Sequence, residues 1–222
     1  MKAMILAAGR GERMRPLTDD IPKPLLPVTD KSLIEHQIMR LVAAGFHDIV
    51  INHSYLGEQI EAKLSNGQTY GAHLAYSRET EQRLETGGGI RTALPLLGDQ
   101  KFIVINGDVW CDYPLANLRR ELKELAHLIM VNNPSHHPAG DFHLHGERLD
   151  FEQQPRLTFS GIGIYHPDLF KEYPAHQPFP LAPLLKNAMR IGQVTGELYD
   201  GYWLDVGTPE RLVELQNRVR GA

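Results

Sequence analysis

The sequence has little cysteine, no long hydrophobic run and no excess of basic residues, and each shortage excludes a class of protein. Cys111 is the single cysteine in 222 residues, so no internal disulfide can form and a reducing compartment is expected. No stretch approaches the roughly 20 apolar residues of a membrane-spanning helix. The apolar start of the chain meets Arg10 too early for a secretory signal. We therefore expect a cytoplasmic protein with no membrane partner.

The charge balance is slightly acidic. Lysine and arginine number 23 and aspartate and glutamate 27, which gives a net charge of −4. Because nucleic-acid binding needs a clustered basic surface, nucleic acid is not an expected partner. A chain of this size buries roughly 70–75% of its unfolded surface, so its core needs neither disulfides nor a structural metal.

Short apolar runs alternate with helically spaced stretches in the first half of the chain. The runs predict strands at 3–7, 48–52, 74–77, 102–106 and 128–132. The spacing predicts helices over 33–42, 57–64 and 115–126. Asp30 is the expected cap of the first helix, and Gly45 its stop. Strands that alternate with helices are typical of a mostly parallel sheet with helices on both faces.

The second half is less regular. Its composition predicts a loop at 133–141, a strand at 157–165, a helix at 181–190, a strand and turn at 194–204, and a closing helix at 209–219. No linker or shift in composition separates the halves, and no repeat is present. The sequence therefore predicts one α/β domain over residues 1–222, a doubly wound, Rossmann-like fold with a mixed, mostly parallel sheet.

The strongest chemical signal follows the first predicted strand, where LAAGRGERMRPLT at 6–18 precedes PKPLLPV at 22–28. Gly9 and Gly11 let backbone N–H groups approach phosphate oxygens closely. Arg13 can reach those oxygens as a forked donor, and prolines stiffen the loop that presents Lys23. The third glycine of a dinucleotide fingerprint is replaced by Met14, which disfavours an oxidoreductase. The pattern predicts a phosphate-binding site.

Two aspartates extend this site. Asp108 stands just past the buried run 102–106, at the crevice where doubly wound sheets bind ligands, and its carboxylate suits Mg²⁺. Asp205 lies in the segment WLDVGTPE at 203–210, where Thr208 and Pro209 predict a helix start but leave Asp205 unexplained.

Other segments give weaker signals. The glycines of ETGGGI at 85–90, directly before a predicted helix, permit close backbone approach to a planar group. His136, His137, His143 and His145 match no zinc spacing. Cys111 is expected to be unreactive.

Residues 3–28 resemble the LAAGxGxRxxPxT…PKPLxPV signature of the sugar-1-phosphate nucleotidyltransferases, and the similarity runs from Lys2 to Leu212. The resemblance implies that residues 1–132 bind a nucleotide, that residues 133–222 bind a sugar, and that Mg²⁺ is the cofactor. The implied nucleotide-binding residues are Gly9, Gly11, Glu12, Arg13, Lys23 and Gly88. The implied substrate-binding residues are Asn106, Gly140 and Glu152, the metal ligands Asp108 and Asp205, and the catalytic residues Arg13, Lys23 and Asp108.

Within this family, the short chain and the segments ETGGGI, LTFSGI and GYWLDVGT most resemble the uridylyltransferases of bacterial cell-wall recycling. That resemblance implies UTP and a sugar 1-phosphate, N-acetylmuramate 1-phosphate, as substrates. A mannose-1-phosphate guanylyltransferase and a glucose-1-phosphate uridylyl- or thymidylyltransferase are alternatives, as is a sensor that binds nucleotide or sugar phosphate without turnover. Many relatives carry Glu-Lys-Pro where this chain has Glu152 followed by Gln153.

Overall fold

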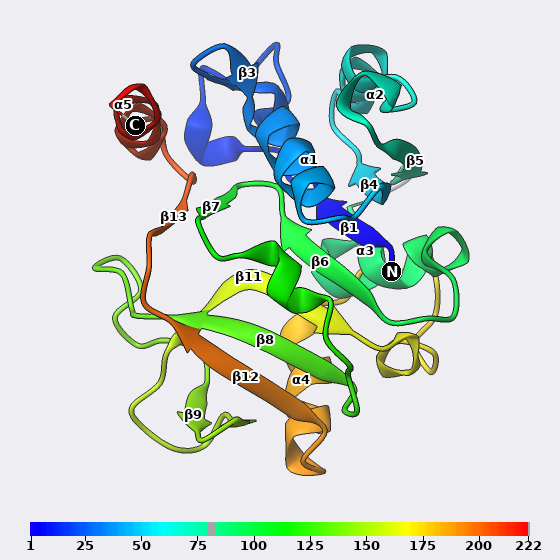
Figure 1. The fold of residues 1–222 in the computed structure, drawn as a ribbon, viewed down its shortest axis with the longest axis vertical. Coiled ribbons are helices and arrows are strands. Elements are labelled where there is room, and N and C mark those ends of the chain that lie inside the picture. Colours follow the sequence, from blue (N-terminus) through cyan, green and yellow to red (C-terminus); the bar gives the residue numbers. More distant parts are fainter. Residues whose placement is uncertain (80–82, 222) are drawn as a thin grey trace.

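A computed structural model describes residues 1–79 and 83–221, which are built around a nine-stranded sheet of order β5-β4-β1-β6-β11-β8-β12-β10-β9 (Figure 1). In this sheet β10 and β11 run opposite to the other strands, so the predicted mixed, mostly parallel sheet is confirmed. The strands are β1 (Ala3–Leu6), β4 (Asp48–His53), β5 (His73–Arg78), β6 (Phe102–Asn106), β8 (Ala126–Val131), β9 (His143–His145), β10 (Arg148–Asp150), β11 (Thr158–Tyr165) and β12 (Val194–Tyr199). Two short pairs, β2 (Pro27–Val28) with β3 (Lys31–Ser32) and β7 (Val109–Cys111) with β13 (Trp203–Asp205), lie outside it.

Helices cover both faces of the sheet, as expected. They are α1 (Leu33–Ala43), α2 (Gly57–Leu64), α3 (Glu85–Leu97), α4 (Leu181–Arg190) and α5 (Pro209–Arg220). Successive residues of β1 point to opposite faces, so Ile5 packs in one core with Ile38 of α1. Met4 packs in the other core with Ile90 of α3 and Leu184 of α4. Among the described residues, no helix is long and apolar enough to span a bilayer.

Two local predictions are wrong. The segment predicted as a helix over 115–126 forms only a short 3₁₀ helix, Leu115–Leu118, and then an irregular stretch that leads into β8. All six residues of β8 are buried between β11 and β12, and this central strand position overrides the local helical spacing. Asp30 does not cap α1; Ser32 does, because the β2–β3 hairpin carries the chain two residues further before the helix begins.

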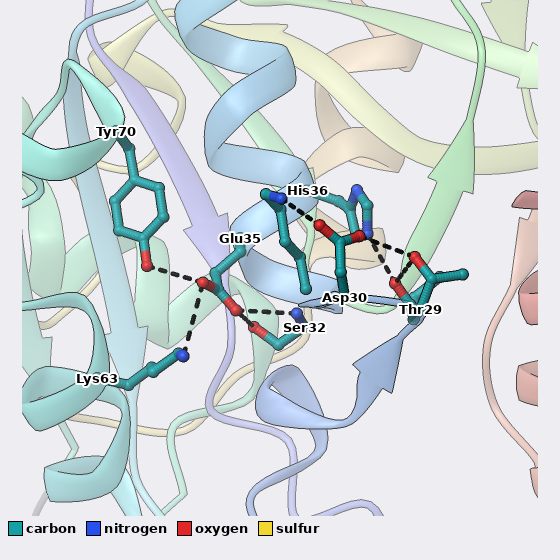
Figure 2. Close-up of polar contacts among 9 residues, drawn as sticks. Thr29, Asp30, Ser32, Glu35, His36, Lys63 and Tyr70 are labelled. Atoms are coloured by element: carbon teal, nitrogen blue, oxygen red, sulfur yellow. Dashed lines mark hydrogen bonds and ion pairs between the residues drawn. The ribbon is translucent and has the colours of Figure 1, made fainter.

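The cap of α1 belongs to a polar cluster built on the buried Glu35 (Figure 2). Its carboxylate accepts hydrogen bonds from the backbone N–H of Ser32 at 2.9 Å and the Ser32 hydroxyl at 2.6 Å. It also accepts one from Tyr70 at 2.9 Å, and the Lys63 ammonium lies 3.8 Å away. Burial opposes the charged form, but these hydrogen bonds outweigh it and lower the pKa of Glu35.

We predict that Glu35→Gln destabilises the fold, because an amide cannot accept all of these hydrogen bonds. The expected loss is about 1–3 kcal/mol at neutral pH. Since the folded-state pKa is lowered, the carboxylate contributes most above the ordinary glutamate pKa, and its contribution falls as pH drops through the folded value. The gap in Tm between the two proteins should therefore narrow toward acid pH. A gap that stays constant from neutral to acid pH would contradict this account.

Candidate active site

A cavity of about 340 Å³ opens at the carboxyl ends of β1, β4, β5 and β6, the edge at which parallel sheets bind ligands. We call it the first cavity. It is lined by Leu6, Ala7, Ala8, Gly9, Gly11, Glu12, Arg13, Lys23, Pro24, Asn52, Glu79, Arg83, Glu85, Thr86, Asn106, Gly107, Asp108 and Gly207. The structure thus brings Asp108 together with most of the site residues that were predicted from the glycine-rich motif.

The two glycines of the motif have different roles. Gly11 has a φ of 70°, and a Cβ there would lie 2.9 Å from the Thr18 methyl group and 3.1 Å from the Lys23 Cβ. The fold itself therefore requires glycine at this position. At Gly9, apart from its two chain neighbours, no atom of the described residues lies within 4 Å of the place a Cβ would occupy, although Gly9 lines the first cavity. Its missing side chain leaves room for a ligand.

The cationic end of the first cavity is organised by an ion pair. Lys23 begins a short 3₁₀ helix, Lys23–Leu25, between two prolines, and its side chain is buried. Its ammonium group donates to Asp108 Oδ2 at 2.6 Å. The Arg13 Nη2 lies 3.0 Å from the place a Cβ on Gly207 would occupy. Arg13, Lys23 and Asp108 thus all line the first cavity.

Asp205 reaches the same region through β13. It lies opposite Val109 in the β7–β13 pair, and the next N–H along, that of Val206, donates to the Asp108 carbonyl at 2.7 Å. The Asp205 carboxylate accepts from Arg211 and lies 3.0 Å from His136 Nε2. Thr208 caps α5 and so positions Arg211 in its first turn.

The donor set of the two aspartates fits a magnesium ion. Each carboxylate is held by a protein cation, Asp108 by Lys23 and Asp205 by Arg211, and both line one further cavity. Mg²⁺ commonly takes one or two carboxylates and completes its shell with phosphate oxygens and water. Within residues 1–79 and 83–221 no group of three or more His, Cys, Asp and Glu side chains could hold a metal alone. The aspartate pair would therefore need substrate oxygens to complete such a site.

A second cavity, of about 310 Å³, adjoins the first. It is lined by Asn106, Asp108, Val109, Pro134, His136, His137, Thr158, Phe159, Ser160, Trp203 and Asp205. A bulge in β11 shapes this wall, where Gly161 has a φ of 81° and a Cβ would lie 2.6 Å from Asn106 Nδ2. Asn106 and Asp108 line both cavities, which marks the boundary between them as the place where two ligands could meet.

Three predicted site residues lie outside both cavities. Gly88 is inside α3, not before it; its N–H donates to the Phe179 carbonyl at 3.1 Å, and a Cβ would lie 2.2 Å from the Gln177 carbonyl oxygen. Gly87 and Gly88 therefore serve close packing of α3 on 177–179. Gly140 packs on the Arg156 carbonyl, 2.7 Å from the place of its Cβ. Glu152 is exposed in the turn after β10.

Two further expectations concern histidine and cysteine. His136 pairs with Asp205, His137 with Asp141 at 3.2 Å, and His143 with the Pro155 carbonyl, so these histidines do not gather around one point. Burial raises the pKa of the Cys111 thiol to about 11, which keeps it protonated and unreactive at neutral pH.

Sequence reasoning missed several lining residues of the first cavity, namely Asn52, Glu79, Arg83, Glu85 and Thr86. The signal for two of them was available. Asn52 ends a predicted parallel strand and Glu79 follows another, the same placement that identified Asp108. Glu85 is the first residue of α3 and has a φ of 57°, a conformation that a sequence without a glycine there does not predict.

Comparisons of sequence and of structure with known proteins both find nucleotidyltransferases. A family model described as nucleotidyl transferase matches residues 2–143. The chain is 51% identical to N-acetylmuramate alpha-1-phosphate uridylyltransferase of Neisseria meningitidis serogroup B, over 97% of both chains. It is 35% identical to the protein of the same name from Caulobacter vibrioides, over 99% of this chain and 97% of that one. The structure of a putative glucose-1-phosphate thymidylyltransferase from Bacillus anthracis has the same fold, with a TM-score of 0.87 at 22% identity, over 100% of this chain and 96% of that one.

The contrast between Gly9 and Gly88 yields a prediction. Gly9→Ala should leave the unfolding temperature unchanged, since no other part of the chain that the structure describes meets the added methyl group, but weaken triphosphate binding about tenfold by filling the cavity. Gly88→Ala should lose about 1–3 kcal/mol of stability, because the new methyl group meets backbone. Thermal unfolding and triphosphate titration of both variants check this. A Gly9→Ala protein with parental affinity would show that no ligand approaches Gly9.

Proposed function

We propose that this chain, which belongs to the nucleotidyl transferase family, transfers the uridylyl group of UTP to N-acetylmuramate 1-phosphate and releases pyrophosphate. The product would be UDP-N-acetylmuramate, a role within peptidoglycan recycling. The observation that carries the choice of substrates is the 51% identity to a uridylyltransferase of this kind over 97% of both chains. In this proposal residues 1–132 hold the triphosphate and residues 133–222 complete the acceptor side.

The geometry of the two cavities supports a transfer between two phosphates. UTP would occupy the first cavity and the sugar 1-phosphate the second, so that their phosphates meet at Asn106 and Asp108. A phosphate oxygen of the acceptor attacks the α-phosphorus of UTP, and the bond to the departing pyrophosphate breaks in line. The attacking oxygen is already anionic, so the reaction needs no general base.

What the protein must provide is alignment of two polyanions and compensation of their charge. Lys23 is held in place by its contact with Asp108, and Arg13 lines the same cavity beside Gly207. Both cations can donate to phosphate oxygens as charge builds up on the leaving group. Asp108 and Asp205 would hold Mg²⁺, which would supply further neutralisation of phosphate charge when bound.

The acceptor side also has chemistry suited to an acidic sugar. An N-acetylmuramyl group carries a lactyl carboxylate, which needs N–H donors or a cation. His136, His137 and the indole of Trp203 line the second cavity, although the Trp203 N–H already donates to the Ser160 carbonyl at 2.9 Å. In this proposal the two histidines would exchange their contacts with Asp205 and Asp141 for the lactyl carboxylate.

We predict that Asp108→Asn abolishes turnover and leaves the fold intact. The change removes a proposed metal ligand and the partner of Lys23, and the rate should fall by at least about 10²–10³. Asp112→Asn is the matched control, because it removes a carboxylate four residues further on, outside both cavities. Pyrophosphate release with UTP at saturating Mg²⁺ measures both variants. Near-parental turnover of the Asp108→Asn protein would show that Asp108 is not a metal ligand.

The substrates are tested by pyrophosphate release from UTP, CTP, GTP, dTTP and ATP. Each triphosphate is paired with the 1-phosphates of N-acetylmuramate, N-acetylglucosamine, glucose and mannose in the presence of Mg²⁺. Release confined to UTP with the muramyl acceptor is the expected result. Release with GTP and mannose 1-phosphate would replace both substrates and keep the family chemistry, and no release with any pair would favour the sensor.

A further inference from the structure

The ends of β4 and β5 carry two buried polar side chains that the transfer chemistry does not use. Asn52 is 2% exposed and Glu79 is 5% exposed, yet both line the first cavity. Asn52 Nδ2 donates a hydrogen bond to Glu79 Oε1 at 2.7 Å. We call this pair the Asn52–Glu79 bridge.

The bridge extends to both walls of the first cavity. The N–H of Ala7, where the glycine loop leaves β1, donates to Asn52 Oδ1 at 3.0 Å. The N–H of Leu84, the residue before α3, donates to Glu79 Oε2 at 3.0 Å. A continuous chain of hydrogen bonds therefore runs from the glycine loop through two side chains to the start of α3.

Helix α3 also rests directly on the bridge. A Cβ on Gly89 would lie 2.8 Å from Glu79 Oε1 and 2.9 Å from Asn52 Nδ2, so the absence of a side chain allows the helix to contact both groups. The N-cap position of α3, Leu84, has no side-chain hydrogen bond of its own. Glu79 accepts the N–H of Leu84 itself, one of the amide groups at this helix end that no intrahelical carbonyl can pair.

A buried carboxylate in a cavity for a polyanion is electrostatically unfavourable and needs a reason. Its two oxygens face two donors, Asn52 Nδ2 and the Leu84 N–H. A glutamine at this position would turn its NH₂ group toward one of those donors and leave a buried N–H unpaired, which is costly. The two hydrogen bonds from Asn52 and Leu84 therefore explain why residue 79 carries a carboxylate.

We propose that Asn52 and Glu79 are positioning residues that set the separation between the glycine loop and the start of α3, and thereby the affinity for the nucleoside triphosphate. The inference rests on the proposed function, because it takes the first cavity as the nucleotide site. Neither residue contacts the reacting phosphates in this scheme. Their loss should raise the KM for UTP and leave the KM for the acceptor near its parental value.

The test exchanges the two functional groups. In Glu79→Gln a donor faces a donor, and in Asn52→Asp two carboxylates face each other. In the double variant Asn52→Asp/Glu79→Gln the introduced carboxylate accepts from Ala7 and from the introduced amide, whose oxygen accepts from Leu84. Every hydrogen bond of the bridge is therefore restored with the charge moved to the other residue.

Each single variant should raise the KM for UTP about tenfold or more, the scale of one buried hydrogen bond left unmade. In the double variant the KM for UTP should return to within about threefold of the parental value. Hydrogen exchange at the amides of Ala7 and Leu84 should be slower in the double variant than in the single variants. The Glu35→Gln protein is the matched control, because it alters a buried carboxylate with several hydrogen bonds outside the first cavity. It should lose stability with no change in the KM for UTP.

Two results would overturn the proposal. One is a parental KM for UTP in both folded single variants, and the other is a folded double variant with a KM no better than the single variants. These outcomes leave the proposed function intact if the parent uses UTP. A parent that turns over a different triphosphate would instead replace the proposed function, and the same proteins would then be compared with that triphosphate.

Discussion

The ion pair between Lys23 and Asp108 is the contact on which the site depends. It joins two segments 85 residues apart, and its lysine is buried, so the ammonium group is held close to one position. A buried charge is costly unless a partner compensates it, and here each charge compensates the other. In the proposed function both groups also act on the substrates, since Lys23 would donate to phosphate oxygens and Asp108 would hold Mg²⁺. The pair therefore keeps two reactive charges aligned without a ligand to hold them.

Apolar packing places two further charged residues, Arg13 and Asp205, in the same region as this pair. A third core joins Met14 and Leu26, which flank the glycine loop and Lys23, to Leu204, Val206 and Leu212 near the C-terminus. Each fully buried side chain of this kind contributes roughly 1.5–3 kcal/mol. The core holds the segment with Arg13 against the segment with Asp205, although the two are distant in the chain. Hydrophobic contacts between the first and last segments thus determine where oppositely charged groups meet.

Elements could be predicted from the sequence where the local hydrophobic pattern agrees with the burial of the same residues in the fold. The parallel strands and the crevice at their carboxyl ends follow from apolar runs, and the placement of Asp108 follows from them. Gly88 was expected beside the nucleotide because a glycine run indicates a close approach without identifying the partner; in the structure Gly88 approaches Gln177, a contact between distant segments. The helix expected over 115–126 failed for a related reason, since only the assembled sheet makes β8 a central strand. Asn52 and Glu79 form no motif, so only their strand-end positions could identify them.

The first cavity is connected by polar links on two sides. On one side Lys23 and Asp108 join the segment after the glycine loop to the turn after β6. On the other, Asn52 and Glu79 join the beginning of that loop to the start of α3. Each link includes a carboxylate with a donor against it: Asp108 Oδ2 faces an ammonium group, and both oxygens of Glu79 face N–H donors. A site for a polyanion can therefore contain acidic groups when donors in the protein compensate their charge. The same engagement determines how far apart the walls stand, so the fold sets the shape of the cavity through groups whose charge would otherwise oppose binding.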